Sequence, residues 1–136
     1  MRATVRIFDA VPATPVLVRT ILPFASTFQG GIASLAVGRA NSNDAIPDVI
    51  AGAANGGNAM VEVRDGQTSA LLSAFTAYTD ASRQAPVRAV VRDTNNDGVI
   101  DEIWTAQGTD GRTRQLNRTF SSLWGGFSPD AKLKTA

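Results

Sequence analysis

The sequence DVIAGA at residues 48–53 returns 53 residues later as DEIWTA at residues 101–106. Each copy follows a loop rich in Asn and Asp and precedes a turn that contains Gly. The stretches SLAVGR at residues 34–39 and VRAVVR at residues 87–92 are separated by the same 53 residues. Strands and loops that recur in the same order indicate a repeat architecture.

A second similarity covers the other half of the unit. VRIFDA at residues 5–10 resembles VEVRDG at residues 61–66, and each is followed by a short turn and an apolar strand, at residues 16–22 and 70–75. A weaker pair, residues 113–116 and 121–124, follows Trp104. These segments are short and bounded by Gly, Asn, Asp or Pro, and no stretch longer than about ten residues has helical periodicity.

The prediction is therefore an all-β chain of about ten strands, arranged as antiparallel four-stranded units. A unit of roughly 40–50 residues has the size of a propeller blade. We expect a half blade of two strands at residues 1–28, a full blade at 29–80, a second full blade at 81–128 and a C-terminal tail at 129–136, frayed from residue 131 onward. The alternative is a β-sandwich whose strands resemble one another by chance.

Composition excludes several classes of protein. The chain has 136 residues and contains neither Cys nor His, which excludes disulfides, thiol nucleophiles, Ser-His-Asp hydrolysis and His- or Cys-ligated metals. A net charge of +1 provides no strong attraction for nucleic acid. The beginning of the chain alternates apolar and polar residues instead of resembling a signal peptide, and no apolar run approaches the ~18 residues of a membrane span.

The segment DTNNDGVID at residues 93–101 has the most informative spacing. Oxygen-bearing side chains occupy its first, third, fifth and ninth positions, and Gly98 occupies the sixth. Calcium takes about 6–8 oxygen ligands, and alternate residues of a tight loop can converge on one ion. Gly98 permits the sharp turn, with a positive φ, that brings in a backbone carbonyl. The predicted Ca2+ ligands are Asp93, Asn95, Asp97, Asp101 and the carbonyl of Val99.

This loop resembles only the first half of an EF-hand. The twelfth position, which needs a bidentate Glu, is Trp104, and the flanking segments have the pattern of strands. The alternative is an Asx-rich turn without metal, because Asn and Asp favour turns. The equivalent loop at residues 40–48 is poorer in ligands: Ser42, Asp44 and Asp48 could form a weak second site, but Ala45 replaces the turn Gly.

These motifs together resemble the FG-GAP/VCBS-type repeats of integrin-α-like β-propellers, in the variant of bacterial surface and secreted proteins. The matching features cover residues 3 to about 120: Gly56-Gly57, the V-x-V strand at 61–63, Asp65-Gly66, Leu71-Leu72, the aromatic corner at 75–78 and the calcium loop. The last unit, residues 112–127, lacks a clean V-x-V strand and Asp-Gly turn. The resemblance implies four-stranded blades around an axis, with calcium in the hairpin loop that joins a blade's first two strands.

Propellers of this family close with about six or seven blades, whereas this sequence holds roughly two and a half. Three explanations stay open: further blades of a longer chain, a homo-oligomeric ring, or terminal blades adapted as caps. In each case open strand edges need protection from water.

The expected function is non-catalytic: a calcium-stabilised propeller module of a secreted or cell-surface protein, in adhesion, protein interaction or as a scaffold. Its protein or glycan partner is not encoded in any motif. The alternative is a carbohydrate-binding, lectin-like module, in which Trp104 or Trp124 stacks on a sugar. Packing of both indoles between blades is the competing explanation. An enzyme is not expected, because the obvious carboxylate cluster is accounted for by calcium.

Overall fold

The computed structural model describes residues 2–40, 45–78, 85–107, 116–123 and 126–135, and beyond Ala106 it describes only the backbone. In these ranges the chain is all-β and contains no helix. Ten strands follow one another: β1 (Val5–Asp9), β2 (Val16–Ile21), β3 (Ile32–Gly38), β4 (Asp48–Ala53), β5 (Met60–Arg64), β6 (Leu71–Thr76), β7 (Val87–Arg92), β8 (Glu102–Gln107), β9 (Leu116–Leu123) and β10 (Gly126–Thr135).

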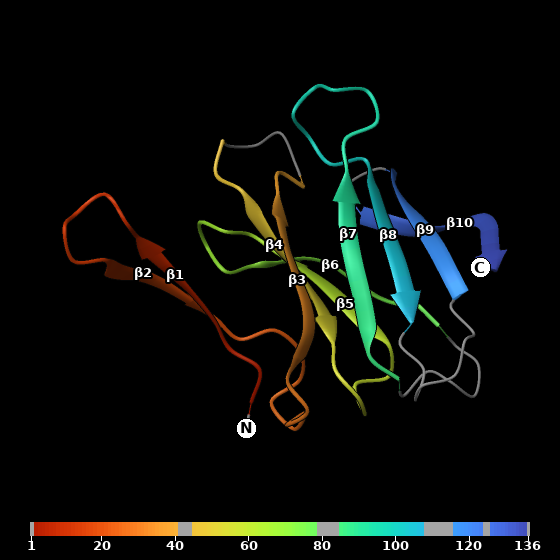
Figure 1. Ribbon diagram of the computed structural model, residues 1–136, viewed down its shortest axis with the longest axis horizontal. Coiled ribbons are helices and arrows are strands. Elements are labelled where there is room, and N and C mark those ends of the chain that lie inside the picture. Colours follow the sequence, from red (N-terminus) through yellow and green to blue (C-terminus); the bar gives the residue numbers. More distant parts are fainter. Residues whose placement is uncertain (1, 41–44, 79–84, 108–115, 124–125, 136) are drawn as a thin grey trace.

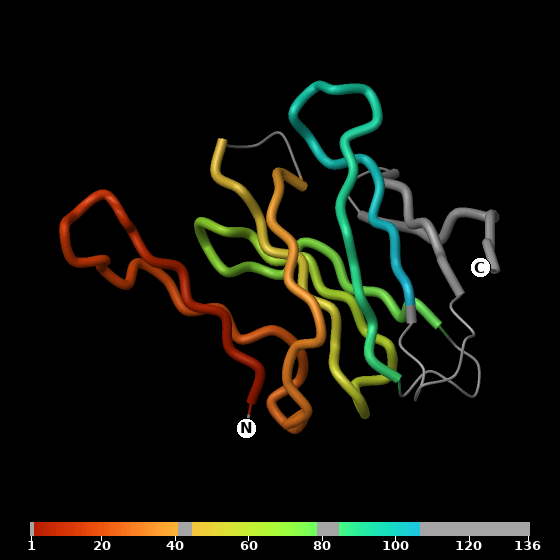
Figure 2. The backbone as a smooth tube through the Cα atoms, in the orientation of Figure 1, coloured from red at the N-terminus to blue at the C-terminus, as the bar shows by residue number. Residues whose placement is uncertain are grey.

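The strands form three antiparallel sheets in chain order. β1 pairs with β2 alone, while β3-β4-β5-β6 and β7-β8-β9-β10 are four-stranded meanders. Figure 1 shows the β1–β2 hairpin standing to one side of the two larger sheets, and the tube in Figure 2 follows the same path. The all-β prediction is confirmed, and each large sheet has the strand order of one blade.

The C-terminal sheet differs from the expected strand positions. One long strand, β9, spans residues 116–123, where two short strands were expected on either side of a turn. The residues expected as a frayed tail continue β10 as far as Thr135. The run from Arg118 to Leu123 contains no Gly or Pro to interrupt pairing with β8. Pro129 is compatible with β10 because that strand lies at the sheet edge and its register shifts between Pro129 and Leu133.

The main core lies between the two four-stranded sheets. It contains apolar residues of β4, β5, β7 and β8, with Tyr78 and Ile100 from the adjoining loops. A polar contact reinforces it: the Tyr78 hydroxyl donates to the Thr105 carbonyl at 2.9 Å, inside the core. Smaller clusters fix the hairpin, where Val5 and Ile21 pack on Val49 of β4.

The two large sheets share one buried cluster. Ile50 of β4 and Ile103 of β8 are both fully buried in it. The strand registers pair Gly38 with Asp48 and Arg92 with Glu102, so Ile103 occupies the position of Val49, which packs on the hairpin. The described sheets do not close into a ring.

The close approach of β7 depends on two small residues. Ser34 of β3 donates its hydroxyl to the Val87 carbonyl at 3.0 Å and accepts the Ala89 N–H at 2.9 Å. Gly52 of β4 lies beneath the same carbonyl, and a Cβ on Gly52 would collide with the Val87 oxygen. The Val87 oxygen belongs to the backbone, and the nearby Ser34 hydroxyl is held by its two hydrogen bonds. Neither atom can move aside cheaply to make room for a Cβ on Gly52.

We predict that Gly52→Ala destabilises the fold by about 1–3 kcal/mol, because the added methyl group pushes β7 away from the β3–β4 face. Urea denaturation followed by circular dichroism measures the change. Val37→Ala, at an exposed position on β3, is the matched control and should stay within about 0.5 kcal/mol of the parent. Equal stability of Gly52→Ala and the parent would show that the two sheets do not approach as closely as described.

Candidate functional site

The predicted calcium loop joins β7 to β8 and projects beyond the ends of the sheets (Figure 1). Its base is closed by a backbone bond from the Asp101 N–H to the Arg92 carbonyl at 3.0 Å. Residues 93–98 are exposed, whereas Ile100 is buried in the inter-sheet core. The Ile100 N–H also donates to the Arg39 carbonyl at 2.6 Å, at the end of β3. The loop is therefore anchored to both sheets at its C-terminal side.

The first half of the loop is organised by its own side chains. The two carboxylate oxygens of Asp93 accept the N–H groups of Asp97 at 3.2 Å and of Gly98 at 2.7 Å. Asn95 Oδ1 accepts the same Asp97 N–H at 3.3 Å, and Asp97 Oδ1 accepts the Val99 N–H at 2.9 Å. The three predicted side-chain ligands Asp93, Asn95 and Asp97 thus all curl onto one short stretch of backbone.

Two residues of the loop have left-handed backbone conformations. Asn96 has a φ of 61° and Gly98 a φ of 87°. Asn is one of the few residues with a side chain that tolerates this region, and Gly enters it without strain. The positive φ predicted for Gly98 is confirmed.

Asp101 is held by Thr94 across the mouth of the loop. The Thr94 hydroxyl donates to Asp101 Oδ2 at 2.6 Å, and the Thr94 N–H lies 3.1 and 3.0 Å from the two carboxylate oxygens. The Thr94 hydroxyl bond, supported by the backbone N–H, lowers the pKa of the Asp101 carboxyl below its ordinary value because it stabilises the charged form. Thr94 therefore stabilises the charged form of Asp101 and fixes its position at the mouth of the loop.

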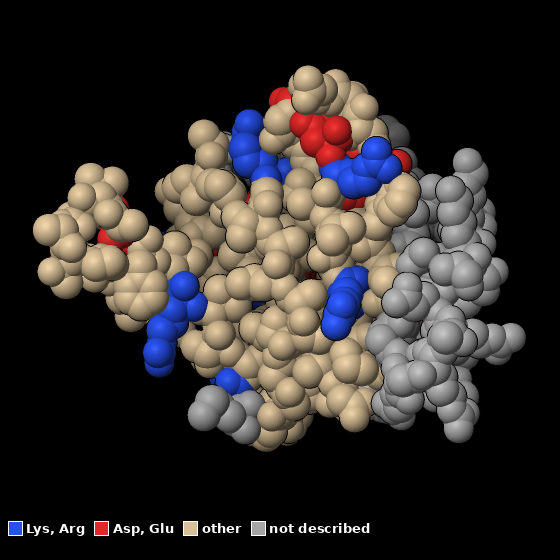
Figure 3. Space-filling model, viewed as in Figure 1, with Lys and Arg blue, Asp and Glu red and all other residues tan. Residues whose placement is uncertain are grey.

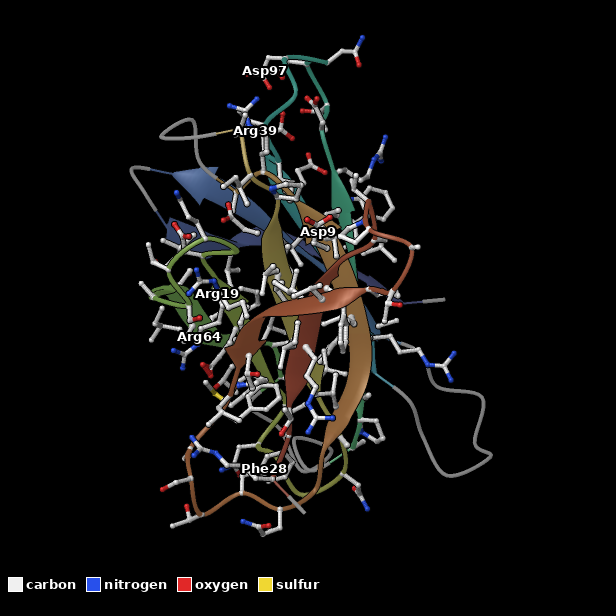
Figure 4. The ribbon with its side chains drawn as sticks, turned by 90° about the vertical axis from the view of Figure 1, so that its left-hand side faces the viewer. Asp9, Arg19, Phe28, Arg39, Arg64 and Asp97 are labelled. Atoms are coloured by element: carbon white, nitrogen blue, oxygen red, sulfur yellow. The ribbon has the colours of Figure 1, made fainter. Side chains whose placement is uncertain are left out.

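Charge of both signs gathers at this end of the molecule. Figure 3 shows acidic side chains on the projecting loop with basic side chains beside them. Figure 4 places Arg39 next to the loop that carries Asp97, and a Cβ on Gly98 would lie 3.6 Å from Arg39 Nη1. The guanidinium group thus partly balances the carboxylates. Among the residues that the structure describes, no group of three or more acidic side chains is already placed to hold a metal ion.

In the second predicted loop, the carboxylate of Asp48 binds backbone N–H groups. Asp48 is buried, and its oxygens accept the Ala40 N–H at 2.8 Å and the Gly66 N–H at 3.1 Å. Ser42 and Asp44, the other two possible ligands, lie outside the described residues. Asp48 therefore links its own loop to the β5–β6 turn by backbone hydrogen bonds.

Sequence reasoning missed a pocket at the opposite end of the β3–β6 sheet. Its volume is about 620 Å³, and its lining includes Phe24, Phe28 and Met60 beside the ion pair of Glu62 and Arg64. Arg64 Nη2 donates to Glu62 Oε1 at 2.7 Å, and the Phe24 N–H donates to Glu62 Oε2 at 2.6 Å. Glu62 alternates with valines in β5, a pattern that predicts an exposed position. It is buried because residues 24–28 cover that face of the sheet.

The two tryptophans, considered for sugar stacking, give little support to that function. Trp104 is half-buried, with the guanidinium carbon of Arg92 4.6 Å from its ring centroid. Its Nε1 donates to Glu102 at 2.6 Å, so the ring is occupied on one face and fixed at its edge. Trp124 lies outside the described residues.

Comparison with protein-family models and with curated protein sequences gives no match for this chain. The resemblance to FG-GAP/VCBS repeats therefore stays a prediction from the sequence. In the described part of the chain, no helix is long and apolar enough to cross a membrane.

We predict that Thr94→Val raises the pKa of Asp101 towards the ordinary carboxyl value, because the hydroxyl donor to the carboxylate is lost. A lowered folded-state pKa gives stability that is present above the unfolded-state pKa and disappears as the pH falls through the folded-state pKa. The parent should therefore lose this contribution in strongly acidic solution, and Thr94→Val should have less to lose.

Side-chain carboxyl NMR titration measures the shift. Thr94→Ser keeps the hydroxyl and is the matched control, which should titrate like the parent. Identical Asp101 titrations in the Val and Ser variants would remove the Thr94 hydroxyl as the cause.

Proposed function

We propose that this chain is a non-catalytic, calcium-binding β-repeat module of a secreted or cell-surface protein, acting in adhesion, protein interaction or as a scaffold. The observation that carries the proposal is the arrangement of Asp93, Asn95 and Asp97, whose side chains turn inward onto the backbone of residues 97–99. Each carboxylate oxygen has a second lone pair after accepting one N–H bond. An ion could therefore bind without dismantling the turn.

Calcium suits this loop better than other cations. The available donors are carboxylate, amide and carbonyl oxygens, which are hard ligands, and the chain has no His or Cys to favour zinc or copper. Magnesium requires near-ideal octahedral geometry and loses its water reluctantly, whereas calcium accepts irregular sites with more ligands. The exposed residues 93–98 can adjust to such a site.

The expected affinity connects the site with an extracellular location. The position of the bidentate Glu is taken by Trp104, and the Arg39 guanidinium next to the loop opposes a bound cation. Extracellular calcium modules work with dissociation constants of about 10⁻⁴–10⁻³ M. A site of this strength fills outside cells and stays mostly empty in cytosol.

The blade-type repeat is part of the same proposal. A four-stranded antiparallel meander in chain order, with its metal loop between the first two strands, supports the resemblance to FG-GAP/VCBS units. The described sheets do not close into a ring. We therefore base the function on the loop and the repeat unit, and not on ring closure.

We predict that millimolar Ca2+ raises the melting temperature of the parent and that Asp97→Asn abolishes the increase. The substitution keeps an oxygen that can accept the Val99 N–H but removes the charge that the ion needs. Differential scanning fluorimetry with and without Ca2+ measures the shift, and isothermal titration calorimetry measures the binding.

Asp9→Asn removes one negative charge from a different turn and should leave the calcium response intact. Mg2+ at equal concentration should give a smaller shift. The site is wrong if Ca2+ changes neither the melting temperature nor the amide NMR signals of residues 93–101.

A further inference from the structure

Among the described residues, no strand pairs with the edge of β1 that faces away from β2. β5 and β9, the third strands of the two meanders, are each paired on both sides. β1 corresponds to β5 in the repeat, because residues 5–10 resemble residues 61–66, yet it pairs only with β2. A regular strand with a free row of N–H and C=O groups is a template for another strand.

The other edge of the hairpin is less suited to pairing. The register between β1 and β2 shifts after Ile7, so that Ile7 faces Arg19, Phe8 faces Leu17, and Val18 is the extra residue of β2. A β-bulge bends its strand and disrupts the ladder, which is one way in which proteins protect an edge. β2 also corresponds to β6, which is an outer edge of its sheet. The free edge of β1 is therefore better suited to pairing than that of β2.

We propose that this edge pairs antiparallel with β1 of a second copy of the chain, which produces the four-stranded sheet β2-β1-β1-β2 across a two-fold axis. Such an interface completes a sheet with the strand number of the other two. An isologous contact of this kind closes on itself, so it stops at a dimer.

Antiparallel geometry restricts the register of this pairing. In a hydrogen-bonded pair both residues point their N–H and C=O groups towards the partner, and those residues alternate along each strand. Because the two strands are identical, two residues can face each other only if both numbers are odd or both are even. The residue numbers of every pair therefore sum to an even number. Full overlap of Val5–Asp9 then places Ile7 opposite Ile7 of the second copy, with Arg6 opposite Phe8 and Val5 opposite Asp9.

The neighbouring even registers are poorer. A centre at Arg6 places two guanidinium groups directly opposite each other, which is destabilising. A centre at Phe8 leaves Val5 and Arg6 without partners in β1 of the second copy. The register centred on Ile7 contains no pair of like charges and places an Arg cation beside an aromatic ring twice, which is attractive.

Exposed apolar side chains on the hairpin favour a partner strand that also carries apolar side chains. Phe8 is 51% exposed and its cross-strand partner Leu17 is 48% exposed. Figure 1 shows the hairpin projecting from the larger sheets, and Figure 3 shows few charged side chains on its surface. Arg6 forms no ion pair within the described ranges. In the dimer, Arg6 of each chain covers Phe8 of the other chain.

The first test is the mass of the native chain, measured by light scattering or sedimentation over a concentration series. We expect a concentration-dependent species at twice the monomer mass of 14.3 kDa. A mass that stays at the monomer value up to several hundred micromolar overturns the proposal.

Variants at Phe8 test the register, because this exposed side chain can be changed without opening the core. Phe8→Lys opposes Arg6 of the second copy with a like charge and should weaken the dimer at least tenfold. Phe8→Glu loses the same ring but opposes Arg6 with an opposite charge, so it should dimerise at least tenfold more tightly than Phe8→Lys. The double variant Arg6→Glu/Phe8→Lys restores the opposite charges and should recover dimerisation.

Val90→Lys adds the same charge at another exposed strand position and should leave the mass unchanged. Circular dichroism confirms that each variant is folded. A dimer that responds identically to Phe8→Lys and Phe8→Glu overturns the proposed register, and a dimer disrupted only by Val90→Lys assigns the interface to the outer face of β7. Calcium is omitted from these measurements, so that dimerisation is decided independently of the metal site.

Discussion

The close contact between β7 and the face of β3–β4 is the constraint on which the rest of the structure depends. Gly52 provides the space for the Val87 carbonyl, and the Ser34 hydroxyl satisfies the carbonyl of Val87 and the N–H of Ala89. Without these two small residues the start of β7 would leave buried polar groups unpaired, and each such group costs about 1–3 kcal/mol. The contact brings the apolar residues of both sheets together into one core. It also fixes where the β7–β8 loop leaves the molecule.

Carboxylates in this chain act mainly on backbone N–H groups at turns. Asp48, Asp65 and Asp93 each accept two such donors, and the Thr68 and Gln67 bonds lower the pKa of Asp65. Several of the acidic side chains that the structure describes therefore help to build loops. The same chemistry explains why a calcium loop and an Asx-rich turn without metal have similar sequences. Both need Asp and Asn at alternate positions, and spacing alone cannot separate them.

The sequence predicts the strands better than it predicts how they pack. Residues 48–53, 60–64 and 87–92 form strands close to the expected positions, because alternation and turn residues are local signals. Hairpin register is not local. Ala36 pairs with Ile50, whereas Ile103 pairs with Val91 and not with Ala89, the residue 53 positions after Ala36. Turn geometry sets this register, so a gapless repeat in the sequence need not be a gapless repeat in the structure.

The burial of individual polar residues does not follow from the local sequence pattern either. Glu62 occupies the outward position of a half-buried strand by its pattern, and the segment that covers it is almost forty residues away in the chain. The candidate metal residues differ from Glu62, because they belong to one turn. Their positions in the loop follow from their spacing in the sequence. Only Ser42 and Asp44 lie outside the described residues. Local motifs are therefore recovered, while contacts between distant segments are not.

The anchoring of the predicted calcium loop connects its exposed residues with the core. Ile100 is buried between the sheets and its N–H bonds to Arg39 after β3, while residues 93–98 extend into solvent only a few positions earlier. An ion bound by the exposed part would restrict the same backbone that carries Ile100 into the core. Binding free energy contributes to stability to the extent that the unfolded chain cannot bind the ion. A surface metal loop in this position can therefore strengthen the contact between two sheets without lying between them.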